Sequence, residues 1–134
     1  FLWAQMEEAE SITRMRLDIW QQYHQALASL ENAGKLCRPI IPSGCQHNAH
    51  MYYILLESLE KRTEVIAQLK AQSILSVFHY VPLHSAPAGR KYSRTCGMMK
   101  HTDDLSDRLL RLPLWIGVED DQNRIIDILR KIID

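Results

Sequence analysis

Two histidines near the middle of the chain, His79 and His84, have the side-chain type and spacing that most favour chemistry. An imidazole titrates near neutral pH and can act as an acid, a base or a ligand. The two bracket Tyr80-Val81-Pro82-Leu83, at the carboxyl end of a predicted strand that opens into a long loop. Such strand ends commonly display binding groups. Two interpretations stay open: a binding role, or hydrogen bonds that only hold the strand end.

A second group, Cys45, His47 and His50, brings a thiol and two imidazoles close together in sequence. Zinc accepts such ligands, but a structural zinc site needs a complete ligand set at suitable spacing. Neither Cys37 nor Cys96 completes a known pattern, so an ordinary loop is the favoured interpretation and zinc binding the alternative. Because the cysteines are odd in number and irregularly spaced, reduced thiols are expected.

The remaining residues show no catalytic arrangement. The five glycines are scattered, so there is no glycine-rich loop to hold a phosphate, and no serine lies in a nucleophile elbow. No lysine has the evidently desolvated setting that Schiff-base chemistry needs. His24, on a predicted helix, and His101, in a polar loop, are expected to be solvated. The chain is therefore expected to lack an active centre of its own.

Length and charge limit the class of protein. The chain has 134 residues, 46% of them hydrophobic, with 16 basic and 16 acidic side chains and a formal net charge of zero. A single globular domain of this size can form a core without a disulfide or a metal. Zero net charge and the lack of an evident Lys/Arg cluster argue against a general nucleic-acid binder, while a local basic patch stays open as an alternative. No segment approaches the roughly 18 apolar residues of a membrane span, and a cytosolic location is expected.

The amino-terminal residues suggest a piece of a larger protein. They already have the pattern of a helix interior, and charge arrives at Glu7 too early for a signal peptide. Apolar residues recur at steps of three and four from Leu2 to Leu30, which predicts one long amphipathic helix that ends at Gly34. Such a helix rises about 45 Å, more than this domain needs. Its first turns are therefore expected to pack on something missing.

The rest of the chain predicts an α+β fold. Strands are expected at 51–56, 74–80 and 111–115, helices at 59–72 and 103–110 and from 119 onward, and a long loop at 81–101. Ser58 and Thr102 are the expected N-caps, and Pro113 predicts that its strand pairs on one side only or lies at an edge. The last helix is expected to bury a stripe formed by Ile125, Ile126, Ile128, Leu129, Ile132 and Ile133. This order predicts a small, mostly antiparallel sheet with helices on one face.

Several motifs together carry a resemblance to a known family. Residues 78–89 read Phe-His-Tyr-Val-Pro-Leu-His-Ser-Ala-Pro-Ala-Gly, and residues 108–114 read Arg-Leu-Leu-Arg-Leu-Pro-Leu. With residues 2–7 and 48–53, and in this order, they resemble the carboxyl-terminal domain of the DegT-type sugar-nucleotide aminotransferases over essentially the whole chain. One departure is Gln72-Ser73, since many relatives have a glycine before the second strand.

The resemblance implies a single small carboxyl-terminal domain of a fold-type I aminotransferase over residues 1–134. Residues 1–33 would form the helix that links it to a large, cofactor-binding amino-terminal domain absent from this chain. The parent enzyme would depend on pyridoxal phosphate, form a homodimer, and move an amine from glutamate to a dTDP-ketosugar. Because the cofactor lysine belongs to the large domain, the chain alone is expected to be inactive and to hold no cofactor. No nucleic acid or membrane partner is expected.

The resemblance also implies that the loop after the 74–80 strand lies near the active-site mouth. His79, Tyr80 and His84 are then candidates for contact with the sugar nucleotide. Tyr80 offers a stacking face and a hydroxyl, and either histidine could hydrogen-bond a sugar hydroxyl or a phosphate. The alternative is that these residues only shape the loop. For the whole chain, the alternative is an independent, non-enzymatic interaction or regulatory module, and zinc binding is one version of that alternative.

Overall fold

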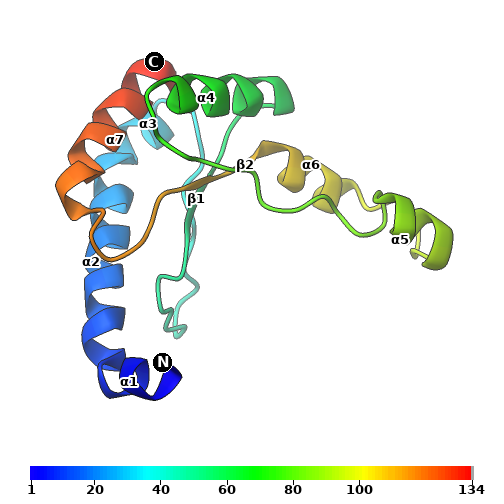
Figure 1. The fold of residues 1–134 in the computed structure, drawn as a ribbon. Coiled ribbons are helices and arrows are strands. Elements are labelled where there is room, and N and C mark those ends of the chain that lie inside the picture. Colours follow the sequence, from blue (N-terminus) through cyan, green and yellow to red (C-terminus); the bar gives the residue numbers. More distant parts are fainter. Residues whose placement is uncertain (134) are drawn as a thin grey trace.

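The computed structural model describes residues 1–133, in which helices pack around a small sheet and one segment extends away from it (Figure 1). Along the chain the elements are α1 (Leu2–Glu7), α2 (Ala9–Ala26), α3 (Ala28–Asn32), β1 (Tyr52–Leu55), α4 (Leu59–Ala71), α5 (Pro87–Tyr92), α6 (Lys100–Arg108), β2 (Leu109–Leu112) and α7 (Glu119–Ile133). The predicted α+β class is confirmed. None of the helices in residues 1–133 combines the length and apolarity that a bilayer crossing requires.

The predicted long amino-terminal helix is present as three consecutive segments. The backbone leaves ideal helical angles at Glu8 (φ −105°, ψ 13°) and at Leu27 (φ −92°, ψ 3°), which separates α1, α2 and α3. α1 turns away from the axis of α2 (Figure 1). Gly34, with φ 72°, ends the run as predicted. Its N–H donates to the carbonyl of Glu31, and that of Lys35 donates to Leu30, so the free carbonyls of α3 are satisfied.

The sheet is a two-stranded antiparallel ladder with one buried face. β1 and β2 pair with Tyr52 opposite Leu112. Because side chains alternate along a strand, one face collects the buried residues Tyr52, Ile54, Leu110 and Leu112. α2 packs on this face through Tyr23, whose ring stacks on Tyr52 at a centroid distance of 5.3 Å. The hydroxyl of Tyr23 donates a hydrogen bond of 3.0 Å to the carbonyl of Pro113, just beyond β2.

The predicted strand 74–80 is wrong, since it reduces to a single bridge. Val77 and Arg111 exchange backbone hydrogen bonds of 3.3 and 2.8 Å. The residues on either side of Val77 form no further pairs with β2 in the part of the chain that the structure describes. As predicted from Pro113, the third strand pairs on one side only: β2 forms a ladder with β1, and its other side carries a single bridge to Val77. Pro113 follows the last residue of β2, so its missing N–H removes no ladder hydrogen bond.

Two of the helices match their predicted patterns closely. α4 begins after Ser58, whose Oγ accepts from the N–H of Lys61 at 3.2 Å, as an N-cap does. α7 begins at Glu119 as predicted. Most of its predicted stripe is buried, while Ile128 and Ile132 are only partly covered.

The predicted loop 81–101 is wrong where it missed α5, and the following helix starts earlier than predicted. α5 has Pro87 in its first turn, where the missing N–H costs nothing. The N-cap of α6 is Met99, not Thr102, and the helix ends at Arg108. The next residues, predicted as helix, belong to β2.

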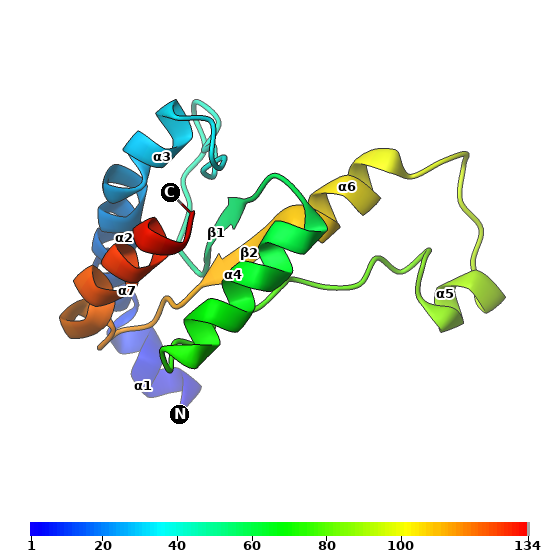
Figure 2. The same ribbon diagram turned by 90° about the horizontal axis from the view of Figure 1, so that it is seen from above.

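Residues 78–108 form a projection, which we call the arm, that leaves the domain beside β2 and returns through α6 (Figure 2). Its helices α5 and α6 contain no buried residue, so the arm has no core of its own. Backbone contacts shape it instead. The carbonyl of Pro82 accepts from the N–H groups of Ser85 and Ala86 at 3.1 and 3.0 Å. Near the end of α6, the guanidinium of Arg62 in α4 donates to the carbonyl of Ser106 at 2.9 Å.

Gly89 lets α5 lie against the part of the arm that precedes it, residues 78–86, which we call the outgoing limb. A Cβ at this position would lie 1.5 Å from the carbonyl oxygen of Leu83 and 2.5 Å from its carbon. These distances are far inside van der Waals contact, and the obstacle is backbone. Only glycine fits this close approach.

We expect Gly89→Ala to separate α5 from the outgoing limb, because the added methyl collides with Leu83. Hydrogen exchange of the amides at Ser85, Ala86 and Ser93 should become at least about 10-fold faster, since local opening costs less free energy. Ala88→Ser, at the exposed neighbouring position, is the control and should leave these rates unchanged. Unaltered exchange in Gly89→Ala would contradict the close approach.

α4 ends in a turn that places a serine in the left-handed region. Ser73 has φ 60°. Its N–H donates to Lys70 and that of Ile74 to Leu69, both at 2.9 Å, which is the hydrogen-bond pattern of a Schellman motif. A Cβ crowds this backbone conformation, whereas glycine adopts it freely.

We expect Ser73→Gly to raise the free energy of unfolding by about 0.5–1 kcal/mol, because it relieves the strain of the positive φ. Urea denaturation followed by circular dichroism measures the change. Gly34→Ser places the same residue in the equivalent turn after α3, where φ is 72°. It should lower stability by a similar amount. Equal stability of Ser73→Gly and the parent chain would show that Ser73 is unstrained.

Candidate functional site

A hollow at the base of the arm contains Tyr80, one of the predicted site residues. Its volume is about 370 Å³, and it is lined by Arg62, Phe78, Tyr80, Val81, Pro82, Ser85, Asp103, Ser106 and Asp107. Tyr80 is 71% exposed, so its ring and hydroxyl remain available. The guanidinium of Arg62 lies 5.3 Å from the centroid of the Phe78 ring, in cation–π range. The hollow therefore combines a cation, carboxylates and aromatic surfaces.

His79 lies beside Tyr80 with one ring nitrogen unused. The two ring centroids are 4.5 Å apart at an interplanar angle of 67°, an edge-to-face contact. The Nδ1 atom of His79 is buried and has no hydrogen-bond partner in residues 1–133. A buried polar atom without a partner costs free energy, about 1–3 kcal/mol in typical cases. This nitrogen is therefore suited to a hydrogen bond with a bound group.

His84 has a different role in the geometry. Its Nε2 lies 2.8 Å from Oδ1 of Asp103, which joins the outgoing limb of the arm to α6. One ring nitrogen is thus already engaged. Asp103 lines the hollow, so His84 acts on its wall through this carboxylate. The structure places Tyr80 in the lining of the hollow, puts His79 against the ring of Tyr80 but outside that lining, and makes His84 a brace through Asp103.

The arm also carries cations that the sequence analysis missed. Arg90, Lys91, Arg94 and Lys100 are all exposed. Lys91 Nζ lies 5.0 Å from the ring centroid of Tyr92, which is 78% exposed. The arm therefore carries a local basic patch although the chain as a whole is neutral. The signal that could have found it is the absence of any acidic residue between Glu64 and Asp103.

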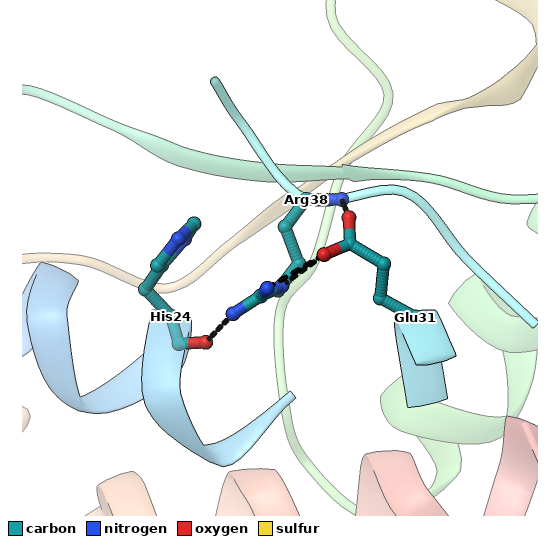
Figure 3. Close-up of polar contacts among 3 residues, drawn as sticks. All are labelled: His24, Glu31 and Arg38. Atoms are coloured by element: carbon teal, nitrogen blue, oxygen red, sulfur yellow. Dashed lines mark hydrogen bonds and ion pairs between the residues drawn. The ribbon is translucent and has the colours of Figure 1, made fainter. Parts of the chain in front are cut away.

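A second polar cluster joins the end of α2 and α3 to the segment before β1 (Figure 3). The Nη2 and Nε atoms of Arg38 lie 2.6 and 2.7 Å from Oε2 of Glu31. The backbone N–H of Arg38 donates to the other carboxylate oxygen at 2.7 Å, and its Nη1 donates to the carbonyl of His24. Arg38 is thus fully engaged and fastens this segment to the helices.

The prediction that His24 is solvated is wrong, because its side chain is partly buried. Its ring stacks on Trp20 at a centroid distance of 4.5 Å, and its Nδ1 atom is buried without a partner in the described chain. Burial, and secondarily the charge of Arg38, lowers the pKa of His24, while Glu31 opposes the shift. The hydrogen bond from the backbone of Arg38 is the main cause that lowers the pKa of Glu31. His101, by contrast, is exposed as predicted.

The zinc alternative is wrong for the part of the chain that the structure describes. Residues 1–133 contain no group of three or more His, Cys, Asp or Glu side chains placed to hold a metal. The ring of His47 packs edge-on against Trp20 at 4.7 Å. Cys45 and His50 are exposed, as are the other cysteines, Cys37 and Cys96. The contact with Trp20 therefore positions the ring of His47.

The lysines do not fit the role of an anchor for pyridoxal phosphate. Such an anchor needs a desolvated setting in which the amine can be uncharged. Lys61 is half-buried, but its ammonium donates to the carbonyl of Ile132 at 3.2 Å and pairs with Glu64 at 3.5 Å. The other lysines, Lys35, Lys70, Lys91, Lys100 and Lys131, are exposed. These residues do not supply the anchoring group.

We expect the Arg38 cluster to make stability depend on pH in two ranges. Because folding lowers the pKa of His24, the unfolded chain binds a proton first, and stability falls as pH drops below the usual histidine value of 6.5. The lowered pKa of Glu31 gives stability that is present above 4.5 and is lost as pH falls through its folded value. Urea midpoints measured across this range test both.

His24→Gln should reduce the loss of stability that begins as pH falls below 6.5. It should keep the loss of stability below pH 4.5, which comes from Glu31. Arg38→Gln should lower stability at neutral pH by about 1.5–3 kcal/mol, since it breaks charged hydrogen bonds. The same pH profile for His24→Gln and the parent chain would remove His24 as the source of the upper step.

Comparison with known proteins gives this geometry a context. The sequence pattern of the DegT/DnrJ/EryC1/StrS aminotransferase family matches residues 1–130. A curated relative, the dTDP-3-amino-3,4,6-trideoxy-alpha-D-glucose transaminase of Micromonospora megalomicea, is 25% identical over 121 residues. The match covers 88% of this chain and 32% of that protein. This chain spans about a third of the length of the curated relatives it matches.

Solved structures agree with the family match. An aminotransferase of Brucella abortus, of the DegT DnrJ EryC1 StrS type, is 30% identical, with a TM-score of 0.81 over 97% of this chain and 33% of that one. The PLP form of a candidate sugar aminotransferase of Streptococcus pneumoniae, 21% identical, gives a TM-score of 0.79 over 98% and 33%. The predicted fold class, a small domain of fold-type I aminotransferases, is confirmed. The chain belongs to the DegT/DnrJ/EryC1/StrS aminotransferase family.

Proposed function

We propose that the chain is the carboxyl-terminal small domain of a pyridoxal phosphate-dependent sugar-nucleotide aminotransferase. The parent would convert dTDP-4-keto-6-deoxy-D-glucose to dTDP-4-amino-4,6-dideoxy-D-galactose with glutamate as the amino donor, in the pathway to enterobacterial common antigen. Family membership over residues 1–130 supports the class of reaction. The dTDP-sugar named for the Micromonospora relative supports the nucleotide and the class of sugar. The motifs around residues 78–89 and 108–114 are the basis for this particular product.

The single observation that carries the proposal is the hollow beside Tyr80 on an arm of this family's domain. Tyr80 would place its exposed ring against the substrate and its hydroxyl on a sugar or phosphate oxygen. His79 would donate from or accept at its unpartnered Nδ1. His84 would keep these groups in place through Asp103. The domain would therefore bind and orient the sugar nucleotide.

The transfer itself would take place on another part of the parent. Pyridoxal phosphate, when bound there, would carry the amino group between donor and acceptor. The lysines of this chain do not fit its anchor, so the chain would contribute one wall of the site. The parent would work as a homodimer with its sites at the subunit interface, as the resemblance implies. In this proposal the isolated chain has no transaminase activity.

The amino-terminal helix would connect the domain to the rest of the parent. α1 contains no buried residue. Its large apolar side chains are exposed, from 63% to 111%, at Phe1, Leu2, Trp3 and Met6. Contiguous exposed apolar side chains of this kind mark an interaction surface. Residues 1–33 would then be the inter-domain helix, with α1 packed on the large domain.

We expect variants of the hollow to weaken substrate use in the full-length gene product that carries this chain. His79→Gln and Tyr80→Ala should each raise the KM for the dTDP-ketosugar or lower kcat, with a drop of about 10-fold in kcat/KM for the loss of one substrate contact. The absorbance of the bound cofactor should stay unchanged, because neither residue would touch it.

His50→Gln, at an exposed position before β1, is the matched control and should keep the kinetics of the parent enzyme. Unchanged kinetics in both hollow variants would remove the hollow from the site. Failure of the full-length gene product to transfer an amine to any dTDP-ketosugar would reject the function itself.

A further inference from the structure

Arg62 lies where the two ends of the arm meet the domain. It belongs to the first turn of α4, a helix that the fully buried Val65 and Leu69 hold in the core and that contacts both α6 and β2 (Figure 2). Its guanidinium carbon lies 5.3 Å from the ring centroid of Phe78, at the start of the outgoing limb. Its Nη1 donates to the carbonyl of Ser106 in α6 at 2.9 Å. One side chain rooted in the domain therefore touches both ends of the arm.

The charge of Arg62 is held by these two contacts and not by a carboxylate. None of the ion pairs among residues 1–133 includes Arg62. Asp103 also lines the hollow, but its carboxylate contacts His84 at 2.8 Å. The Nε atom of Arg62 is buried and has no hydrogen-bond partner in the described chain. Loss of the ring or of the carbonyl would leave this half-buried cation still less satisfied, so both contacts are costly to break.

The two contacts reach both segments that line the hollow. Phe78 and Tyr80, two positions apart on the outgoing limb, are lining residues, and α6 supplies three more. α5 and α6 bury no side chain, so no packing within the arm fixes the distance between these segments. That distance therefore depends on Arg62 together with the link between His84 and Asp103.

We propose that Arg62 is a positioning residue for the sugar-nucleotide site, because it holds the outgoing limb and α6 to α4 and so sets the place of Tyr80 at the hollow. The inference rests on the proposed function, which assigns the hollow to the substrate. Arg62 acts through Tyr80 and makes no contact with the substrate itself. A direct ionic contact between Arg62 and the bound substrate is the competing role, and the test separates the two.

The main test combines two variants in the full-length gene product that carries this chain. Arg62→Gln should lower kcat/KM for the dTDP-ketosugar about 10-fold, mainly through KM, since a cation–π contact and a charged hydrogen bond are lost. Because Arg62 acts through Tyr80, Arg62→Gln should have little further effect in a Tyr80→Ala background. Losses that multiply in the double variant would overturn the inference in favour of direct contact with the substrate.

Variants of Phe78 test the ring contact and leave the cation in place. Phe78→Leu removes the π face but keeps an apolar side chain, so it should raise the KM for the ketosugar about 2- to 5-fold. Phe78→Tyr keeps a ring face and should raise KM less than Phe78→Leu does. If leucine and tyrosine had the same effect at this position, an apolar side chain alone would be enough, which contradicts positioning through the cation–π contact.

Arg124→Gln is the matched control for Arg62→Gln. Arg124 is an exposed arginine of α7, outside the lining of the hollow, and its guanidinium donates to the carbonyl of Gln72 at 2.7 Å. The control therefore removes a guanidinium–carbonyl hydrogen bond of the same kind. It should leave both KM and kcat unchanged. A loss of kcat/KM as large as that of Arg62→Gln would show a general effect on the fold and overturn the inference.

Hydrogen exchange separates the inference from the proposed function, because it needs no activity. In Arg62→Gln the amides of Val77 and of Asp107 in α6 should exchange at least about 5-fold faster, since both ends of the arm lose their anchor. Faster exchange in a gene product that transfers no amine would reject the proposed function and support Arg62 as the anchor. Amine transfer with unchanged exchange and unchanged kinetics in Arg62→Gln would overturn only the inference.

Discussion

The contact between Tyr23, Tyr52 and Pro113 fixes the arrangement on which the rest of the structure depends. Tyr23 is fully buried, stacks on Tyr52 of β1, and donates to the carbonyl that follows β2. One side chain of α2 thereby holds both strands. Burial raises the pKa of both tyrosine hydroxyls well above the usual value, so the donor stays protonated over the whole working pH range. Since α6 runs directly into β2, this contact also sets the direction in which the arm leaves.

Local patterns predicted those elements that bury their own apolar face. The stripe of α7 and the Ser58 cap of α4 each depend on a few neighbouring residues, and they could be predicted from spacing. The segment 74–80 could not, because an apolar pattern does not say whether a neighbouring strand pairs with it, and only Val77 forms a bridge. α5 was missed for a similar reason. Pro87 and Gly89 are usual signs of a loop, yet here proline suits the first turn and glycine permits a close approach.

In the candidate site too, contacts within a local motif could be predicted, whereas contacts between distant segments could not. His79 and Tyr80 are neighbours in sequence, so their ring contact follows from the motif that contains them. The pairing of His84 with Asp103 joins residues 19 positions apart through the return of the arm, and no local pattern contains it. His24 was expected to be solvated from its place on the predicted helix. Its actual partners, Trp20 and Arg38, come from the preceding helical turn and from the segment after α3.

An arm without a core imposes a physical requirement on any site that it carries. Ordering a residue costs about 1–2 kcal/mol of backbone entropy, and α5 and α6 bury no side chain that could offset this cost. Their order therefore depends on a few backbone contacts, on the His84–Asp103 link and on whatever binds to the arm. A ligand that touches both the hollow and α5 would stabilise the arm by the free energy of its binding. Such coupling lets a single substrate both order the arm and be held by it, whereas a ligand confined to the hollow would leave the outer end to open independently.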